Sequence, residues 1–377
     1  MSAVSSPEGK APSPGFSSTD HAMMARALRL AERGAYTTRP NPMVGCVIAR
    51  GDEVIGEGFH QRAGEPHAEV FALREAGERA RGVTAYVTLE PCAHDGRTPP
   101  CAPQLIAAGV ARVVVACGDP FPQVAGAGIA ALREAGIIVD TGLLETQARN
   151  LNRGFLSRIE RGRPWLRVKL AMSLDGHTAL ASGESKWISS GPSRLDVQRW
   201  RARCGALLTA SGTVLKDDPQ LTVRMDDGAP FVPPLRVVLD PGLAIPAQSQ
   251  ILDDAAPTLL LHAPDARVPK YLRQRDHAAV AAAEGMLDLD AALRLLAQRG
   301  INEVQTEAGA TLCGSLLRAG LVDELLLYVV PVLLGANGRP LFAGWDAPTM
   351  AERYDLEVVE TRRVGPDLRL LLRTKGR

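Results

Sequence analysis

The chain has 377 residues, of which 46% are hydrophobic and 23% charged, and this length and composition predict a globular protein with two domains. The formal net charge of +1 counts against nucleic acid or an anionic membrane as a partner, and the sequence has no apolar run of about 18 residues that would predict a membrane span. Six unevenly spaced cysteines argue against a disulfide framework and favour a reducing cytoplasm.

We expect residues 1–18, rich in Ser, Pro, Gly and Ala, to form a disordered extension. After them the chain alternates helical and strand-like patterns, which is typical of an α/β domain around one sheet. Thr19 or Asp20 is the expected N-cap of the first helix. The expected helices are 19–34, 67–80, 104–108, 125–135 and 143–156, and the expected strands are 44–49, 53–59, 85–89, 110–117 and 137–140. Asn41, in a loop with two prolines, is either a turn residue or an amide that recognises substrate.

One imidazole and two thiols lie within a short stretch of the first half: His67, Cys92 and Cys101. These are ligand types that suit zinc, and three protein ligands leave a fourth position for water, which is the catalytic arrangement. Glu69 follows His67 by two residues, where it could move protons, and Cys92 is expected to open a helical segment. A His-Ala-Glu at a helix start or two core cysteines would mean little alone. Together they favour the layout of the zinc-dependent nucleobase deaminases.

In the second half, a charged stretch at 158–164 is the expected linker between the domains. The expected strands are 165–171, 206–210, 235–240, 258–262, 303–307, 325–331 and 368–373, and the expected helices are 193–204, 289–299 and 311–319. A Gly-containing turn at 307–312 opens a helix whose free N–H groups could bind phosphate. The Gly-x-Gly-x-x-Gly fingerprint of ordinary dinucleotide-binding folds is absent. Trp187 is either a core residue or a cofactor contact.

The segment 88–101, with its Gly-Arg-Thr-Pro-Pro-Cys ending, resembles the family of bifunctional riboflavin biosynthesis enzymes, as do 40–42, 64–69 and 119–120. The eight residues between Cys92 and Cys101 are this family's pattern, and the resemblance covers nearly the whole chain from about residue 20. It implies an α/β fold with an N-terminal cytidine-deaminase-like three-layer domain over 19–160. A C-terminal dihydrofolate-reductase-like domain is implied over 161–377.

The implied chemistry comprises two consecutive steps. The first is zinc-dependent hydrolytic deamination of 2,5-diamino-6-(5-phosphoribosylamino)pyrimidin-4(3H)-one to 5-amino-6-(5-phosphoribosylamino)uracil and ammonia. The second is NADPH-dependent reduction to 5-amino-6-(5-phosphoribitylamino)uracil. The resemblance further implies a cytoplasmic homo-oligomer that acts on this small phosphoribosyl aminopyrimidine, with no nucleic acid and no membrane as partner.

The resemblance also assigns residues. His67, Cys92 and Cys101 would bind one Zn²⁺, and Glu69 would be the proton donor. The implied NADPH-binding residues are Ala171, Trp187, Thr213, Asp217, Gly309, Ala310, Thr311, Leu312, Cys313, Gly314 and Ser315. The substrate-binding candidates are Ser185, Arg201, Leu221, Arg224 and Glu307 in the second half and Asn41, His94 and Arg97 in the first. Arg201 and Arg224 suit a phosphate, as do His94 and Arg97. The sequence departs from the family's common residues at Ala93, Asp95, Pro241 and Ala310.

Three other interpretations stay open at this point. A deaminase of nucleic acid would share the zinc motif, but the neutral charge counts against it. A zinc-stabilised binding protein without catalysis would not need Glu69. The second half could also be a reductase-like domain without activity.

Overall fold

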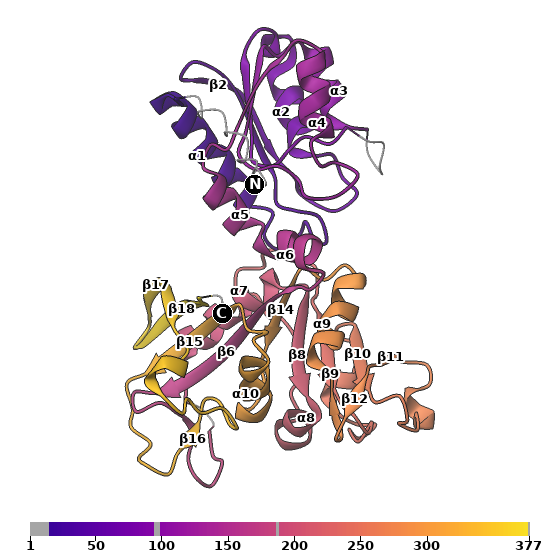
Figure 1. The fold of residues 1–377 in the computed structure, drawn as a ribbon, viewed down its shortest axis with the longest axis vertical. Coiled ribbons are helices and arrows are strands. Elements are labelled where there is room, and N and C mark those ends of the chain that lie inside the picture. Colours follow the sequence, from indigo (N-terminus) through magenta and orange to yellow (C-terminus); the bar gives the residue numbers. More distant parts are fainter. Residues whose placement is uncertain (1–14, 94–98, 186–187, 376–377) are drawn as a thin grey trace, which may run out of the picture. The chain divides into compact units, whose positions relative to one another are not determined.

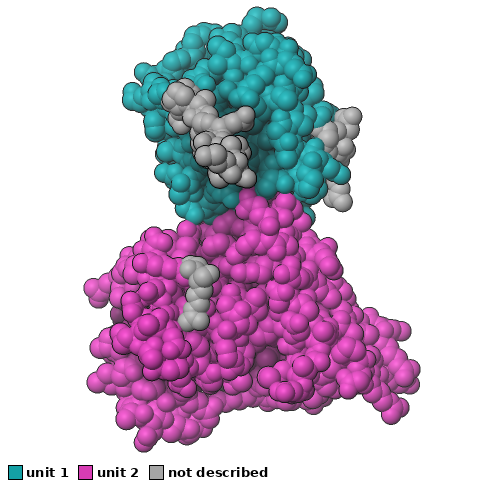
Figure 2. All heavy atoms as spheres, in the orientation of Figure 1, with its two compact units in different colours: residues 1–152 teal, residues 153–377 magenta. Residues whose placement is uncertain are grey.

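The computed structural model describes residues 15–93, 99–185 and 188–375. The chain divides into two compact units, Met1–Asn152 and Arg153–Arg377, each with its own sheet and core (Figures 1 and 2). The sequence predicts a boundary between the deaminase domain and the reductase domain near residue 160. This position of the functional boundary stays a prediction. None of the described helices combines the length and apolarity that a membrane crossing requires.

Unit 1 is a five-stranded sheet of order β2-β1-β3-β4-β5, with β3, β4 and β5 parallel and β1 antiparallel to both neighbours. Its strands are β1 Gly45–Arg50, β2 Glu53–Phe59, β3 Thr84–Val87, β4 Arg112–Val115 and β5 Ile138–Thr141. Its helices are α1 Ser18–Glu32, α2 Ala68–Ala76, α3 Cys101–Ala108, α4 Ala127–Glu134 and α5 Glu145–Leu151, with a 3-10 turn at Gly77–Ala80. Helices α2, α3 and α4 cover one face of the sheet, and α1 and α5 cover the other (Figure 1). The expected three-layer α/β fold is confirmed.

The first helix begins at Ser18, one residue before the expected start, and its N-cap is not one of the two expected residues. Ser17, not Thr19 or Asp20, is the N-cap of α1: its hydroxyl accepts from the Asp20 N–H at 3.0 Å. The Asp20 carboxylate accepts from the Ser17 N–H at 2.9 Å and completes a capping box. Asp20 also accepts from Tyr86 and Arg112, at 2.9 and 2.6 Å, so this buried carboxylate ties α1 to the sheet.

Helix α1 crosses β1 at a position that requires glycine. A Cβ on Gly45 would lie 2.0 Å from the Ala27 carbonyl oxygen and 2.9 Å from the Ala31 backbone nitrogen. Both are backbone atoms of a packed helix, so neither can move aside without displacing α1. We therefore expect Gly45→Ala to destabilise unit 1 by about 1–3 kcal/mol, as overpacking does.

Thermal unfolding of the purified variant measures this effect. Gly118→Ala is the matched control, because the nearest atom to its added Cβ is 3.8 Å away, an ordinary contact. Equal melting temperatures for the Gly45 and Gly118 variants would contradict the close approach of α1 to β1.

Unit 2 is built on a nine-stranded sheet of order β11-β10-β9-β8-β14-β6-β15-β18-β17, in which only β18 runs antiparallel to the other strands. The sheet strands are β6 Trp165–Ser173, β8 Ala206–Ala210, β9 Leu235–Leu239, β10 Thr258–His262, β11 Asp276–Ala279, β14 Glu303–Thr306, β15 Glu324–Val330, β17 Leu356–Val364 and β18 Asp367–Thr374. Short pairs form from β7 His177–Ala179 with β16 Arg339–Pro340 and β12 Ala282–Ala283 with β13 Met286–Leu287.

The helices of unit 2 are α6 Arg153–Arg161, α7 Gly191–Arg203, α8 Ser211–Asp217, α9 Leu289–Gln298 and α10 Ala310–Arg318, with 3-10 turns at Gln250–Leu252, Lys270–Leu272 and Met350–Glu352. Helices α9 and α10 pack in the core on one face of the sheet, and α7 and α8 pack on the other. The parallel strands bring their carboxyl ends to one edge, where ligands bind in such sheets.

The charged stretch expected as a linker is ordered structure instead. Helix α6 extends to Arg161, and Arg161 and Arg163 each form an ion pair with Asp323 at 2.8 Å. Buried partners, which the sequence does not reveal, therefore explain this run of arginines.

Candidate active sites

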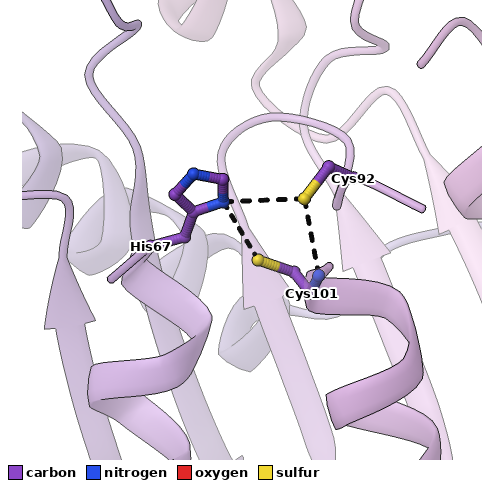
Figure 3. Close-up of side chains that lie close together, drawn as sticks. All are labelled: His67, Cys92 and Cys101. Carbon is purple, nitrogen blue, oxygen red and sulfur yellow. Dashed lines mark hydrogen bonds between the residues drawn. The ribbon is translucent and has the colours of Figure 1, made fainter. Parts of the chain in front are cut away.

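Three metal-ligating side chains meet at the helix starts of unit 1 (Figure 3). His67 is the N-cap of α2, Cys101 is the first residue of α3, and Cys92 lies in the turn that follows β3. The Nδ1 atom of His67 lies 3.2 Å from the Cys101 Sγ and 3.6 Å from the Cys92 Sγ. All three ligand atoms fall within 4.8 Å of one another. The three residues predicted as ligands thus converge, although Cys92 does not open a helix as expected.

The donor set fits a tetrahedral zinc ion. Zinc bonds of about 2.0–2.1 Å to nitrogen and 2.3 Å to sulfur place tetrahedral N and S ligands about 3.6 Å apart, close to the observed spacing. A hydrogen bond with the Cys101 thiol is the main cause that lowers the pKa of Cys92, to about 4, and the same contact raises the pKa of Cys101. Bound zinc would hold both thiols deprotonated.

Glu69 lies in the first turn of α2 and is 2% exposed. Burial is the main cause that raises its pKa. Its Oε2 atom is buried and has no hydrogen-bond partner among the described residues. An unpaired carboxylate oxygen is costly in the interior and is found where a bound ligand completes the site. Glu69 is thus suited to exchange a proton with a molecule held beside the three ligands.

Glu90 anchors the Cys92 segment, a role that the sequence analysis missed. One carboxylate oxygen accepts from the N–H groups of Gly128 and Ile129, at 3.1 and 3.3 Å, at the start of α4. The other accepts from Asp119 and Gly126, at 3.3 and 3.1 Å. The Leu-Glu-Pro-Cys sequence, in which Glu90 lies two residues before the predicted ligand Cys92, was the one signal of this role. The N–H groups that bind Glu90 are distant in sequence, so the sequence did not reveal them.

Asn41 contacts His60, and His60 packs against His67, one of the predicted ligands. His60 is a second residue that the sequence analysis missed. The Nδ1–H of His60 donates to the Pro66 carbonyl at 3.1 Å, so its Nε2 accepts from the Asn41 amide at 3.0 Å. The ring of His60 meets that of His67 edge to face, with centroids 5.4 Å apart. Burial lowers the pKa of His60 and favours this neutral form. His94 and Arg97 lie outside the described residues.

In unit 2, a cavity of about 630 Å³ opens at the carboxyl ends of β8 and β9 and runs along α10. Its volume is in the range of cofactor sites. Its wall includes Thr311, Leu312 and Ser315 of the predicted NADPH set, with Ser211 and Gly212 at the start of α8. Gly309 is the N-cap of α10, so the free N–H groups of Ala310 and its neighbours suit a diphosphate.

Other predicted cofactor residues lie away from this wall. Cys313 is fully buried in the core, and Gly314 packs against the Ala343 backbone, where a Cβ would lie 2.0 Å from the carbonyl oxygen. Thr213 and Asp217 belong to α8, which the sequence analysis did not predict, and Ala171 lies in β6. Trp187 lies outside the described residues. The individual cofactor contacts stay predictions.

Arg201 and Glu307, both predicted substrate residues, form a buried ion pair. The Arg201 guanidinium donates to both Glu307 oxygens at 2.7 Å, and each side chain is 13% exposed. Burial alone would raise the pKa of Glu307, but the charge and hydrogen bonds of Arg201 outweigh it and lower the pKa to about 2. Lys169 of β6 is close enough to Glu307 and Arg201 for its pKa to respond to both.

Lys169 is a further functional candidate that the sequence analysis missed, since it lies in an apolar strand. Burial lowers the pKa of its amine, Glu307 opposes that effect, and Arg201 adds to it. The amine lies 5.7 Å from the ring centroid of the buried Tyr328. A desolvated amine next to a carboxylate is the kind of group that active sites use. The other substrate candidates differ: Ser185 and Arg224 are exposed, and Leu221 is buried.

The Glu307 pair predicts a particular acid sensitivity. Its pKa is about 2 in the folded chain against an ordinary value of 4.5, so its contribution to stability is present above pH 4.5 and is lost as the pH falls toward 2. Glu307→Gln lacks this contribution at every pH. We therefore expect the difference in melting temperature between wild type and Glu307→Gln to narrow between pH 4.5 and pH 2. A difference that is constant over this interval would contradict the pairing.

The sites and folds define a class of protein: an enzyme with a zinc-dependent deaminase unit and a second, dinucleotide-dependent reductase unit. A family model for the cytidine and deoxycytidylate deaminase zinc-binding region matches residues 17–117, and a model for the RibD C-terminal domain matches residues 164–370. The chain is 49% identical to riboflavin biosynthesis protein RibD of Escherichia coli (strain K12), with 94% of this chain and 99% of that protein covered. It is 46% identical to the RibD of Haemophilus influenzae, with 96% and 99% covered.

Solved structures agree over the same length. Acinetobacter baumannii RibD, form 1, is 45% identical with a TM-score of 0.88, and covers 95% of this chain and 99% of its own. A diaminohydroxyphosphoribosylaminopyrimidine deaminase/5-amino-6-(5-phosphoribosylamino)uracil reductase from Thermotoga maritima is 31% identical with a TM-score of 0.83 and the same coverage. The chain belongs to the RibD family of bifunctional deaminases and reductases of riboflavin biosynthesis, whose cofactors are zinc and NADPH.

Proposed function

We propose that this chain deaminates 2,5-diamino-6-(5-phosphoribosylamino)pyrimidin-4(3H)-one and then reduces the ribosyl group of the product to a ribityl chain. The observation that carries the first step is the convergence of His67, Cys92 and Cys101 beside a buried, unpaired Glu69 oxygen. The cavity along α10 and the buried Arg201–Glu307 pair support the second. The substrate is a small molecule, and the similarity to the Thermotoga maritima diaminohydroxyphosphoribosylaminopyrimidine deaminase supports this pyrimidine.

In the deaminase unit, His67, Cys92 and Cys101 would hold the zinc ion. Bound zinc supplies the acidity that makes water a nucleophile near neutral pH. Glu69 would take one proton from the attacking water and deliver it to the ring nitrogen. It would then move the second proton, from the hydroxyl group now on the ring carbon, to the amino group, which leaves as ammonia. Burial raises the pKa of Glu69, which makes its carboxylate a stronger proton acceptor. Asn41, fixed by His60, presents its amide oxygen to the substrate.

In the reductase unit, the free N–H groups at the start of α10, just after Gly309, would hold the diphosphate of the dinucleotide. NADPH supplies the hydride. Glu307, which Arg201 keeps ionised, orients the sugar, and Lys169, whose pKa burial lowers, moves its proton. Because Arg201 is already engaged by Glu307, we assign the substrate phosphate to the exposed Arg224.

Mass spectrometry of the products tests both steps. With the diaminopyrimidine phosphate alone, we expect the deaminated ribosyl compound to accumulate, and with NADPH added we expect the ribityl compound. Ammonia release without NADPH oxidation would leave the first function standing and contradict the second. Oxidation of NADPH with the undeaminated compound would contradict the proposed order.

The finer properties are proposals as well. We place the enzyme in the cytoplasm, which the six free cysteines support. We also propose a homo-oligomer. Strand β17 pairs only with β18 in the described structure, and its Val358 is 62% exposed, so an edge is available for a partner. Light scattering of the purified chain measures the mass, and a monomer at micromolar concentration would contradict this proposal.

A further inference from the structure

The segment from Asp217 to Arg224 carries three of the predicted reductase residues and has an unusual backbone. Asp218 has φ of 40° and Leu221 has φ of 52°, both in the left-handed region that residues other than glycine seldom adopt. Two such residues within four positions persist only where the surroundings over-determine them, and such strain gathers at functional sites. The question is which contacts impose this conformation.

Three alternate carbonyl groups of the segment are held by side chains from elsewhere in unit 2. The Asp218 carbonyl accepts from the Gln250 amide at 3.0 Å. The Gln220 carbonyl accepts from the Arg236 guanidinium at 3.1 Å, and the Thr222 carbonyl accepts from Arg201 at 2.8 Å. Arg201 is a predicted substrate residue, but no role has been given to Arg236. Its contact lies directly before Leu221.

Arg236 lies in β9, and its side chain is fully buried. Besides Gln220, it donates to the Asp253 carboxylate at 2.7 Å and to the carbonyls of Asp253 and Ala256 at 2.5 Å. The other Asp253 oxygen accepts from the Gln220 side-chain amide at 2.7 Å. Arg236 therefore fixes Gln220 twice, directly at its backbone and through Asp253 at its side chain.

We propose that Arg236 is a positioning residue for the reductase substrate, because it holds the left-handed turn that presents Leu221 and Arg224. The planar guanidinium serves four acceptors from one buried point, which a lysine cannot reproduce. Asp217, at the end of α8, precedes the turn, and Gln250 holds Asp218 independently. We therefore expect Arg236 to position Leu221 and Arg224, the predicted substrate residues, and not Asp217, the predicted cofactor residue. This inference rests on the proposed substrate roles of Leu221 and Arg224.

Steady-state kinetics of the full-length, zinc-loaded enzyme tests the inference. For Arg236→Lys we expect the KM for the deaminated ribosyl substrate to rise about ten-fold or more, since a small displacement of positioning groups is costly. The KM for NADPH and the rate of deamination should stay within two-fold of wild type. Asp253→Asn, whose carboxylate is 36% exposed, should raise the same KM in a chain that keeps its buried arginine.

Arg369→Lys is the matched control. Arg369 is also a buried arginine of this sheet, 5% exposed, and donates to Asp196 and Glu360 at 2.9 and 2.7 Å, away from the turn. It should lower the melting temperature without changing the substrate KM. The positioning role would be overturned if the KM for substrate were unchanged in both Arg236→Lys and Asp253→Asn. It would also be overturned if the KM for NADPH rose as much as the KM for substrate.

Arg224→Ala distinguishes the positioning role of Arg236 from the substrate role of the segment itself. A raised substrate KM in Arg224→Ala with no change in the Arg236 and Asp253 variants overturns the positioning role alone. No change in any of the three overturns the substrate assignment of this segment as well. A rise in all three supports both.

Discussion

Glu69→Gln should release ammonia from the diaminopyrimidine phosphate roughly 10²–10⁴-fold more slowly than wild type, the range that a positioned acid or base contributes. The substitution keeps the shape and removes only the ability to take up a proton. Glu69 is 2% exposed, and its Oε2 atom has no partner in the described part of the chain, so the amide fits without breaking a contact of that oxygen. We expect the variant to retain one zinc per chain and a wild-type melting temperature.

Two variants serve as comparisons for this result. Cys101→Ser removes a ligand, so it should lose both zinc and deamination. Glu78→Gln changes an exposed carboxylate just beyond α2 and should leave both unchanged. In all three variants, reduction of supplied 5-amino-6-(5-phosphoribosylamino)uracil should continue at the wild-type rate. Normal deamination by Glu69→Gln with zinc retained would show that another group moves the proton.

The zinc site was predictable because its chemistry lies in two short segments. His67 and Glu69 are in one helix start, and Cys92 and Cys101 flank one loop, so residue types and spacing alone indicate the metal. Most sheet strands of the second half were also predictable. Strands such as β10, covered on both faces, are continuous apolar runs in the sequence.

Tertiary contacts decided what the sequence analysis missed. One helix was expected over 143–156, but α5 ends at Leu151 and α6 begins at Arg153. Between them, the Asn152 side chain exchanges hydrogen bonds of 2.8 Å with the Met43 backbone. Lys169 looked like an interruption of an apolar strand, and only its closeness to Glu307 indicates a function. Strand β17 is mostly exposed and so lacks the pattern that marks buried strands.

The same limit applies to function in the second half. The motif resemblance assigned both Arg201 and Glu307 to the substrate, but it did not indicate that they bind each other. Their pairing changes the assignment of the phosphate and turns Glu307 into an ionised group fixed in place. Pair contacts between residues 106 positions apart are a property of the fold and are absent from any local pattern.

Breaking the Arg201–Glu307 pair should have the second large effect. Glu307→Gln leaves the Arg201 charge buried without its counter-ion, and removal of one partner of such a pair costs about 3–5 kcal/mol. Each side chain is 13% exposed, so water can compensate only in part. We expect a lower melting temperature for the reductase unit and loss of NADPH oxidation, with deamination preserved.

The double variant Arg201→Met/Glu307→Leu distinguishes stability from function. Replacement of a whole buried ion pair by apolar side chains is often neutral or stabilising, so the melting temperature should recover toward wild type. NADPH oxidation should stay absent, because no carboxylate remains to orient the sugar. If activity returned together with stability, the pair would be a structural element and other residues would orient the sugar. If neither returned, the loss in Glu307→Gln would reflect damage to the fold and not the missing charge.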